Sequence, residues 1–392
     1  MIVRQFLQWL QTAAPGDRAD ATSALARAYL YSDLSSDDRA AAEGAMIMLL
    51  DDPSPLVRRA LADVFALSQK APRVIVHALA SDQPDVAAPI LAQSPLLLDY
   101  ELVDQVATGH IDCQTAIAGR SVLSPAVAAA IAEVGSAQAC LVLIENAGAE
   151  IASFSVDRIV ARFGHLAPIR ETLLQRGDLP AATRQALLAQ LSQTLAGFVV
   201  ARHWLGKDHA DCATREACEK ATIALAADTP CEELADLVMH LRESGQLNAS
   251  LILRALLSGN ILLFEEALAD LADVPVERVS GYIHDPNLSG FAALYGKAGL
   301  PQTAYPAFRE AVAALREGIL LGEVGGATCL KRRMVERVLE GCVEEASSAL
   351  TPLTALLWRF ATEAAREEAR MFCHDLVAED RFVAEEEYRL VA

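Results

Sequence analysis

The residues with the most evident chemistry are one histidine and three cysteines near the middle of the chain. They are His209, Cys212, Cys218 and Cys231. Imidazole and thiolate groups are ligands that zinc prefers, and zinc sites usually hold two ligands within one turn or tight loop. Cys212 and Cys218 lie six positions apart on a predicted helix, so they are badly placed for one ion. We therefore expect buried structural cysteines here and no metal.

Other reactive patterns are incomplete. His165 lacks the acidic neighbour that a phospho-acceptor histidine normally has, and the glycines between Gly322 and Gly326 follow no predicted strand. The phosphate-binding, nucleophile-elbow and zinc-protease consensus patterns are missing from the sequence. Glu344 and Glu345 are adjacent and point to different sides of a helix, so they cannot work as an acid and base pair. The sequence predicts a protein that is not an enzyme and needs no cofactor.

Charged residues at helix corners form the clearest pattern. Asp52 and Asp82, 30 residues apart, each stand just before a proline and a predicted helix, and Arg58 and Arg59 follow the first corner. Because an aspartate side chain can accept hydrogen bonds from free amides, we predict that Asp52 caps the helix beginning at Pro55. A corner that recurs between amphipathic helices is typical of a stacked helical array.

Three arginines stand at helix openings in a strongly acidic chain: Arg58, Arg59 and Arg120. Two roles are open for them. They can pair with acidic neighbours and hold successive repeats together as a ladder, or they can present a recognition site for a partner. Together with Asp52 and Asp82 they are our candidate ladder or partner-binding residues.

Composition narrows the class of protein. The chain has 392 residues, 53% of them hydrophobic and only 5% aromatic, with a net charge of −19. The acidic excess disfavours binding to nucleic acid or to anionic membranes, because both are negatively charged. We find no signal peptide and no apolar stretch of the ~18 residues that a membrane span needs. The eight scattered cysteines suggest a reducing cytoplasm.

Helix-opening signals recur along the whole chain. Serine or threonine precedes proline at five positions, and this pair favours the first turn of a helix. With almost no strand-like alternation, the pattern predicts an all-α solenoid of short helices. We expect a first helical block at residues 1–204, a second at 205–317 and a C-terminal helical hairpin at 329–392. The polar stretch 205–214 and the glycine-containing stretch 318–328 are the predicted breaks.

Several stretches of the chain resemble a known family. Residues 79–91, 94–97, 116–120, 254–260, 264–268, 275–279 and 294–301 are similar to the bacterial domain of unknown function 2336. The corner at Asp52 with Val57-Arg58 also resembles a HEAT repeat, although the second unit has Val86-Ala87 instead. The resemblance covers about residues 40–315. It implies HEAT-like helical stacking and no established activity.

These observations favour a non-enzymatic scaffold or regulator that binds other proteins in a bacterial cytoplasm. The alternative is a small-ligand sensor or an enzyme, with a pocket between the two helical blocks near residues 205–230. Apolar residues recur at helical spacing in the predicted C-terminal hairpin. This hairpin either caps the last repeat or pairs with a partner, including a second copy of the chain.

Overall fold

The fold is all-helical, as predicted. The computed structural model describes residues 9, 12–285, 289–321, 334–340, 357–366, 369, 370 and 373. Throughout these residues the regular structure is helical, and the only sheet-like contact is an isolated parallel bridge between Leu123 and Ala149. Contacts divide the chain into two compact units, Met1–Leu179 and Pro180–Ala392.

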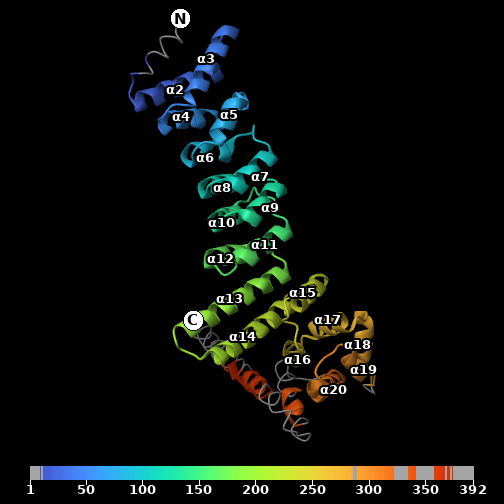
Figure 1. Cartoon of the computed structure of the whole chain (residues 1–392). Coiled ribbons are helices and arrows are strands. Elements are labelled where there is room, and N and C mark those ends of the chain that lie inside the picture. Colours follow the sequence, from blue (N-terminus) through green and yellow to red (C-terminus); the bar gives the residue numbers. More distant parts are fainter. Residues whose placement is uncertain are drawn as a thin grey trace, which may run out of the picture. The chain divides into compact units, whose positions relative to one another are not determined.

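The first unit is a two-layer stack of short helices (Figure 1). In order they are α2 (Pro15–Tyr31), α3 (Ser36–Leu49), α4 (Pro55–Phe65), α5 (Arg73–Ala80), α6 (Pro84–Gln93), α7 (Asp99–Thr108), α8 (Ile111–Ala118), α9 (Pro125–Val134), α10 (Ala137–Glu145), α11 (Ser153–Phe163) and α12 (Ala167–Gln175). The even-numbered helices pack on one another in succession to form one layer. In the odd-numbered layer, α7 packs on α9 and α9 on α11. This is the expected solenoid arrangement.

Short side chains at helical spacing explain why these helices stack. In α4, Val57, Leu61 and Phe65 are fully buried, one turn apart on a single face. Ser124 accepts a hydrogen bond from the amide of Val127 and so caps α9, whose first residue is a proline. Apart from α2 and α3, the helices of the first unit have only about two or three turns each, so their stability comes from packing against neighbours rather than from their own hydrogen bonds.

The second unit begins with a long antiparallel hairpin. Its helices are α13 (Ala181–Ala201), α14 (Lys207–Ala227), α15 (Cys231–Glu243), α16 (Ala249–Leu257), α17 (Ile261–Ala272), α18 (Val276–His284), α19 (Ser289–Lys297) and α20 (Tyr305–Leu321), with a short 3-10 turn at Gln302–Ala304. A core of aliphatic and aromatic side chains lies among α16 to α20, including Phe264, Tyr295 and Phe308.

The described part of the predicted C-terminal hairpin packs on this core. Buried side chains from it join the same cluster as α16 to α20, namely Val335, Val338, Leu339, Leu357 and Phe360. Other parts of the predicted hairpin lie outside the described residues, including Cys342, Val343, residues 347–352, Leu353 and Leu356.

The boundaries differ from those we predicted. The two units meet between Leu179 and Pro180, not at 204/205, because α13 packs on α14 and α15. The polar stretch 205–214 is not a linker: α14 begins at Lys207, and only a short turn separates it from α13. Residues 201–209 are all exposed, so polar side chains there are compatible with helix ends. Helix α20 continues to Leu321, past the expected break at 318.

Candidate functional site

The first predicted corner is held by an ion pair that sequence reasoning did not find. Arg18 of α2 donates from Nε and Nη2 to the two carboxylate oxygens of Asp52, at 3.0 and 2.8 Å. Asp52 Oδ1 also accepts a hydrogen bond from the amide of Ser54 at 2.8 Å. Ser54, not Asp52, is the N-cap residue of α4. The predicted cap is therefore wrong in detail, and Asp52 instead fixes the turn that leads into the helix.

The two corners are connected to each other through Arg58. Its Nε and Nη2 donate to the carboxylate of Asp82 at 2.6 and 3.0 Å, and its Nη1 donates to the backbone oxygen of Asp52 at 2.6 Å. Burial alone would raise the pKa of Asp52, but hydrogen bonds from Arg18 and the Ser54 amide outweigh it and lower that pKa. Both corner carboxylates are therefore bonded within the stack, and the lowered pKa of Asp52 favours its ionised form.

Arg120 and Arg59 occupy different environments. Arg120 Nη1 and Nη2 donate to the backbone oxygens of Leu91 and Ser94 at 2.6 and 2.7 Å, so the guanidinium closes the C-terminal end of α6. Burial lowers its pKa. Arg59 is half-exposed and pairs with Asp63, one turn further along α4, at 2.9 Å. It also donates to the backbone oxygen of Asp85.

Three further side chains close helix ends in the same manner as Arg120. The Nδ2 of Asn146 donates to the oxygens of Ala118 and Arg120, and both Nη atoms of Arg162 donate to oxygens at the end of α9. Gln114 joins the end of α7 to the start of α10. Sequence spacing did not single out Gln114 or Arg162, because a backbone oxygen leaves no mark in the sequence.

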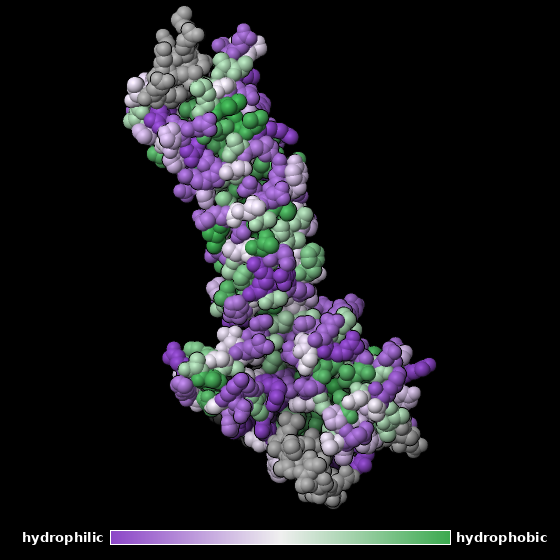
Figure 2. Space-filling view, viewed as in Figure 1, coloured by the Kyte–Doolittle hydropathy of each residue, from purple (hydrophilic) through white to green (hydrophobic). Residues whose placement is uncertain are grey.

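A row of exposed side chains crosses the odd-numbered layer of the first unit. The second residues of α5, α7, α9 and α11 are Val74, Tyr100, Ala126 and Phe154, and we call them the apolar row. Val74 is 64% exposed, and Tyr100 and Phe154 are each 63% exposed. Figure 2 shows apolar side chains reaching the surface between polar ones. Large exposed aromatic groups at equivalent positions of a repeat are candidates for partner contact.

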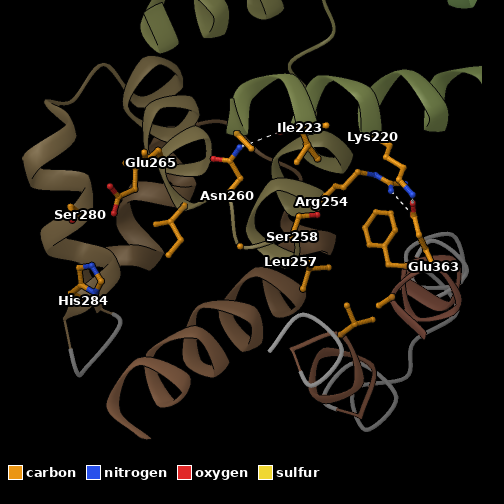
Figure 3. A pocket seen from close by; sticks show the side chains of 18 residues that line it. Lys220, Ile223, Arg254, Leu257, Ser258, Asn260, Glu265, Ser280, His284 and Glu363 are labelled. Atoms are coloured by element: carbon orange, nitrogen blue, oxygen red, sulfur yellow. Dashed lines mark hydrogen bonds and ion pairs between the residues drawn. The ribbon is translucent and has the colours of Figure 1, made fainter. Parts of the chain in front are cut away.

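The second unit contains a pocket of about 710 Å³ (Figure 3). Its walls are α14, the corner between α16 and α17, α18 and the described C-terminal residues. The apolar part of the lining includes Ile223, Leu257, Ile261, Val335 and Phe360. The pocket lies inside the second unit, and four of its lining residues, Lys220, Ile223, Ala224 and Ala227, fall within the stretch 205–230 near which the alternative interpretation expected one. Its volume is that of a small-molecule site.

One end of the pocket carries a network of charged side chains. Arg254 Nη1 donates to Glu363 at 2.7 Å, Arg254 Nε lies 3.7 Å from Glu219, and Lys220 Nζ lies 2.5 Å from Glu363. The guanidinium also stacks over the ring of Phe360, 4.1 Å from its centre. Burial alone would raise the pKa of Glu363, but Lys220 and Arg254 lower it. We call these four charged residues the Arg254 network.

The opposite end carries a carboxylate without such partners. Glu265 of α17 lines the pocket near Ser280 and His284 (Figure 3), and only 7% of its surface is exposed. No described residue donates a hydrogen bond to it or forms an ion pair with it. Asn260, between the two ends, is already used: it accepts from the Leu263 amide at 3.1 Å and donates to the oxygen of Ile223 at 3.4 Å.

The histidine and cysteines that we considered as metal ligands, and expected to be structural instead, do not converge among the described residues. No group of three or more histidine, cysteine or acidic side chains there is arranged to hold a metal ion. His209 and Cys231 are exposed, Cys218 is buried, and Cys212 contacts Glu216 and Arg359.

His165 is exposed at a helix corner. Burial raises the pKa of the Cys140 thiol to about 11, which keeps it protonated.

Comparison with known proteins identifies the family of the chain. A family model described as an uncharacterised protein conserved in bacteria, DUF2336, matches residues 86–347. No curated protein and no solved structure matches the chain. Within the described residues, none of the helices is both long and apolar enough to cross a membrane.

Proposed function

The chain belongs to the DUF2336 family of uncharacterised bacterial proteins, and we propose that it is a non-enzymatic scaffold whose apolar row binds another protein. The observation that carries this proposal is the repeated exposure of Val74, Tyr100 and Phe154 at equivalent helix positions. A two-layer helical stack presents such positions in a line, and solenoids use extended surfaces of this kind for binding.

The spacing of the row suits an extended or helical segment of a partner. Helices in contact are about 8–10 Å apart, so Tyr100 on α7 and Phe154 on α11, separated by α9, are about 20 Å apart. About six extended residues span that distance. Aromatic side chains are the residues that most often dominate binding energy at an interface.

The acidic surface of the chain indicates which charge a partner segment should carry. Asp99 and Asp104 are exposed on α7, beside Tyr100, and the whole chain carries a net charge of −19. We therefore infer a partner segment that combines apolar side chains with lysine or arginine, because opposite charges speed and orient encounter. Nucleic acids and anionic membranes are repelled by the same charge.

Two further features support a scaffold over the alternatives. The pocket residues include no nucleophile paired with a base among those described, which leaves the row as the more developed surface. The described apolar residues of the C-terminal hairpin pack within the second unit, so pairing with a second copy through them is less favoured.

Six described cysteines are free, which supports a reducing compartment such as the cytoplasm.

The test compares partner capture by two variants in the native bacterium. The double variant Tyr100→Ser with Phe154→Ser removes the row, and Tyr31→Ser removes an aromatic side chain that is 81% exposed at the end of α2, outside the row. Tagged full-length proteins are captured, and co-eluting proteins are quantified by mass spectrometry. Circular dichroism first confirms that both variants keep the helical content of the parent.

We expect one or more proteins to be captured by the parent and by Tyr31→Ser, and to fall at least about tenfold with the double variant, since two anchors are lost. The captured protein should contain a basic and apolar segment, and a peptide of that segment should bind the parent directly. Equal recovery with all three proteins contradicts the assignment of the row as the binding surface.

A further inference from the structure

The pocket of the second unit contains an acidic group that the fold leaves unsatisfied. Glu265 is more than nine-tenths buried and lines the cavity, yet no described side chain or amide donates to it. A buried carboxylate normally has a cation or several donors beside it, because removing its charge from water is costly. The cavity beside Glu265 has room for a ligand group that brings a positive charge or hydrogen-bond donors.

The basic residues of the same pocket do not provide a positive charge or a hydrogen-bond donor for Glu265. Arg254 and Lys220 lie at the opposite end of the lining, where both are bonded to Glu363 (Figure 3). His284 also lines the pocket, but no ion pair joins it to Glu265 within the described part of the chain. Arg254 and Lys220 are therefore engaged by Glu363 and not by Glu265.

The surroundings of Glu265 add negative charge. Burial raises the pKa of the adjacent Glu266, and the charges of Asp270, Glu265 and Glu277 raise it further. Among these groups only Asp270 has a described basic partner, Arg242, at 2.9 Å. A concave site with one sign of charge attracts the opposite sign. The field at this end of the pocket favours a cation.

The rest of the cavity is apolar. Leu257, Ile261 and Leu262 from the α16–α17 corner face it together with Ile223 of α14 and Phe360. A ligand that buries apolar surface against these side chains gains free energy in proportion to that area. The lining also offers uncharged hydroxyl groups that could orient a ligand: that of Ser280 near Glu265, and that of Ser258 at the α16–α17 corner near Leu257 (Figure 3).

We propose that this pocket binds a small molecule that carries a cationic hydrogen-bond donor, a primary ammonium group, on an apolar body. The ammonium group donates to the carboxylate of Glu265, and the body lies along Leu257 and Ile261 toward Phe360. No covalent step is involved. The site belongs to the second unit alone and does not depend on the protein-binding row of the first unit.

The experiment measures binding to the full chain by isothermal titration calorimetry with three probes of similar shape. Phenethylamine is cationic, phenethyl alcohol is neutral and hydrocinnamate is anionic at neutral pH. A compound of this size should bind in the millimolar range or tighter. We expect the amine to bind at least about tenfold more tightly than the alcohol, because it forms a charge-assisted hydrogen bond, and the anion not to bind.

Two variants separate a specific contact from general attraction to an acidic protein. Glu265→Gln keeps the shape of the side chain and removes its charge, so amine binding should weaken at least about tenfold while alcohol binding stays the same. Glu266→Gln removes the same charge from the neighbouring residue, which does not line the pocket, and should change amine binding by less than about threefold.

Three results overturn the proposal. They are an amine that does not bind the parent at millimolar concentration, an amine and an alcohol that bind equally, and equal effects of the two glutamine variants. Circular dichroism and thermal melting of both variants establish that each one is folded before binding is compared. Failure here leaves the partner-capture experiment on the first unit unaffected.

Discussion

At the scale of single residues, the main finding is that charged side chains in the first unit act mostly on one another or on the backbone. Asp52 and Asp82 are each held by an arginine from a preceding helix, and Arg120 closes the end of α6. Removing one partner of an ion pair that is largely shielded from water costs more than removing one partner at the surface, because the other charge is left without its partner away from water.

Removing the charge of Asp52 should have an effect that depends on pH. Because the folded-state pKa is lowered, ionised Asp52 stabilises the folded state above the unfolded value of about 3.9, and this contribution disappears as the pH falls through the folded value. We expect Asp52→Asn to lower the free energy of unfolding by about 1–2 kcal/mol at neutral pH and by almost nothing at strongly acidic pH.

Thermal melting of the parent and the variant across the pH range measures this difference. Asp63→Asn is the control, because Asp63 pairs with Arg59 at the surface and should contribute less than about 0.5 kcal/mol at any pH. A difference between the parent and Asp52→Asn that persists undiminished in acid would show that the ionised carboxylate is not its source.

Arg120 and Arg59 provide a second matched comparison. Replacing Arg120 by Met leaves the oxygens of Leu91 and Ser94 without their charged donor, and we expect a loss of about 2–3 kcal/mol. Replacing Arg59 by Met also removes a donor to a backbone oxygen, that of Asp85, but should cost less than the Arg120 change because water reaches the half-exposed Arg59 and can replace its bonds. Urea unfolding monitored by circular dichroism distinguishes the two, and equal losses would mean that closure of α6 does not depend on Arg120.

The corner residues could be recognised from the sequence, but the residues with which they form ion pairs and hydrogen bonds could not. Asp52, Arg58 and Asp82 stood out because their types recur beside prolines. Their partner Arg18 did not, since it lies 34 residues before Asp52 with no motif to connect them. Glu265 was missed for a different reason: its isolation is a property of the pocket, and a glutamate in a helical pattern looks like any solvated residue.

At the scale of elements, the described residues of the C-terminal region are built into the second unit. Leu357 and Phe360 are buried in its core, while Glu363 of the same helical stretch bonds to Arg254 on α16 and Lys220 on α14. The same short element therefore contributes both to the core and to one wall of the pocket. The sequence predicted its apolar spacing but could not indicate which surface it covers.

Loss of the Glu363 carboxylate should loosen this element without unfolding the unit. We expect Glu363→Ala to speed amide hydrogen exchange within residues 357–366 by about tenfold or more, because Arg254 and Lys220 then remain as buried or crowded like charges. Thr362→Ala is the control, since Thr362 is exposed and its hydroxyl bonds only to its own helix. Equal exchange in both variants would show that the apolar contacts alone hold the element.

At the scale of the whole molecule, a chain with a net charge of −19 repels itself. The all-helical class and the repeat character followed from composition and corner spacing. The division into two units did not, because a polar turn at the exposed tip of a helical hairpin has the composition of a linker. Only the packing of α13 on α14 and α15 reveals that these helices belong together.

Self-repulsion predicts how the protein responds to salt. Raising the ionic strength from about 0.01 M to 0.15 M shortens the screening distance from about 30 Å to about 8 Å. We expect the melting temperature to rise over that interval, because repulsion among dispersed acidic groups is screened more than the short, largely buried pairs at the corners. A melting temperature that falls with sodium chloride would mean that attraction between charges outweighs repulsion in this fold.

The side chains that close helix ends in the first unit have a consequence for how such a chain changes over generations. Arg120, Asn146 and Arg162 all donate to backbone oxygens, and every residue type supplies an identical backbone oxygen. A point mutation at the acceptor position therefore cannot delete the acceptor. These hydrogen bonds can therefore persist when many residues of the neighbouring repeat are substituted. After duplication or deletion of a repeat, the new neighbour would still present backbone oxygens that accept from them. Repeats held in this way can lose all mutual similarity while their stacking persists.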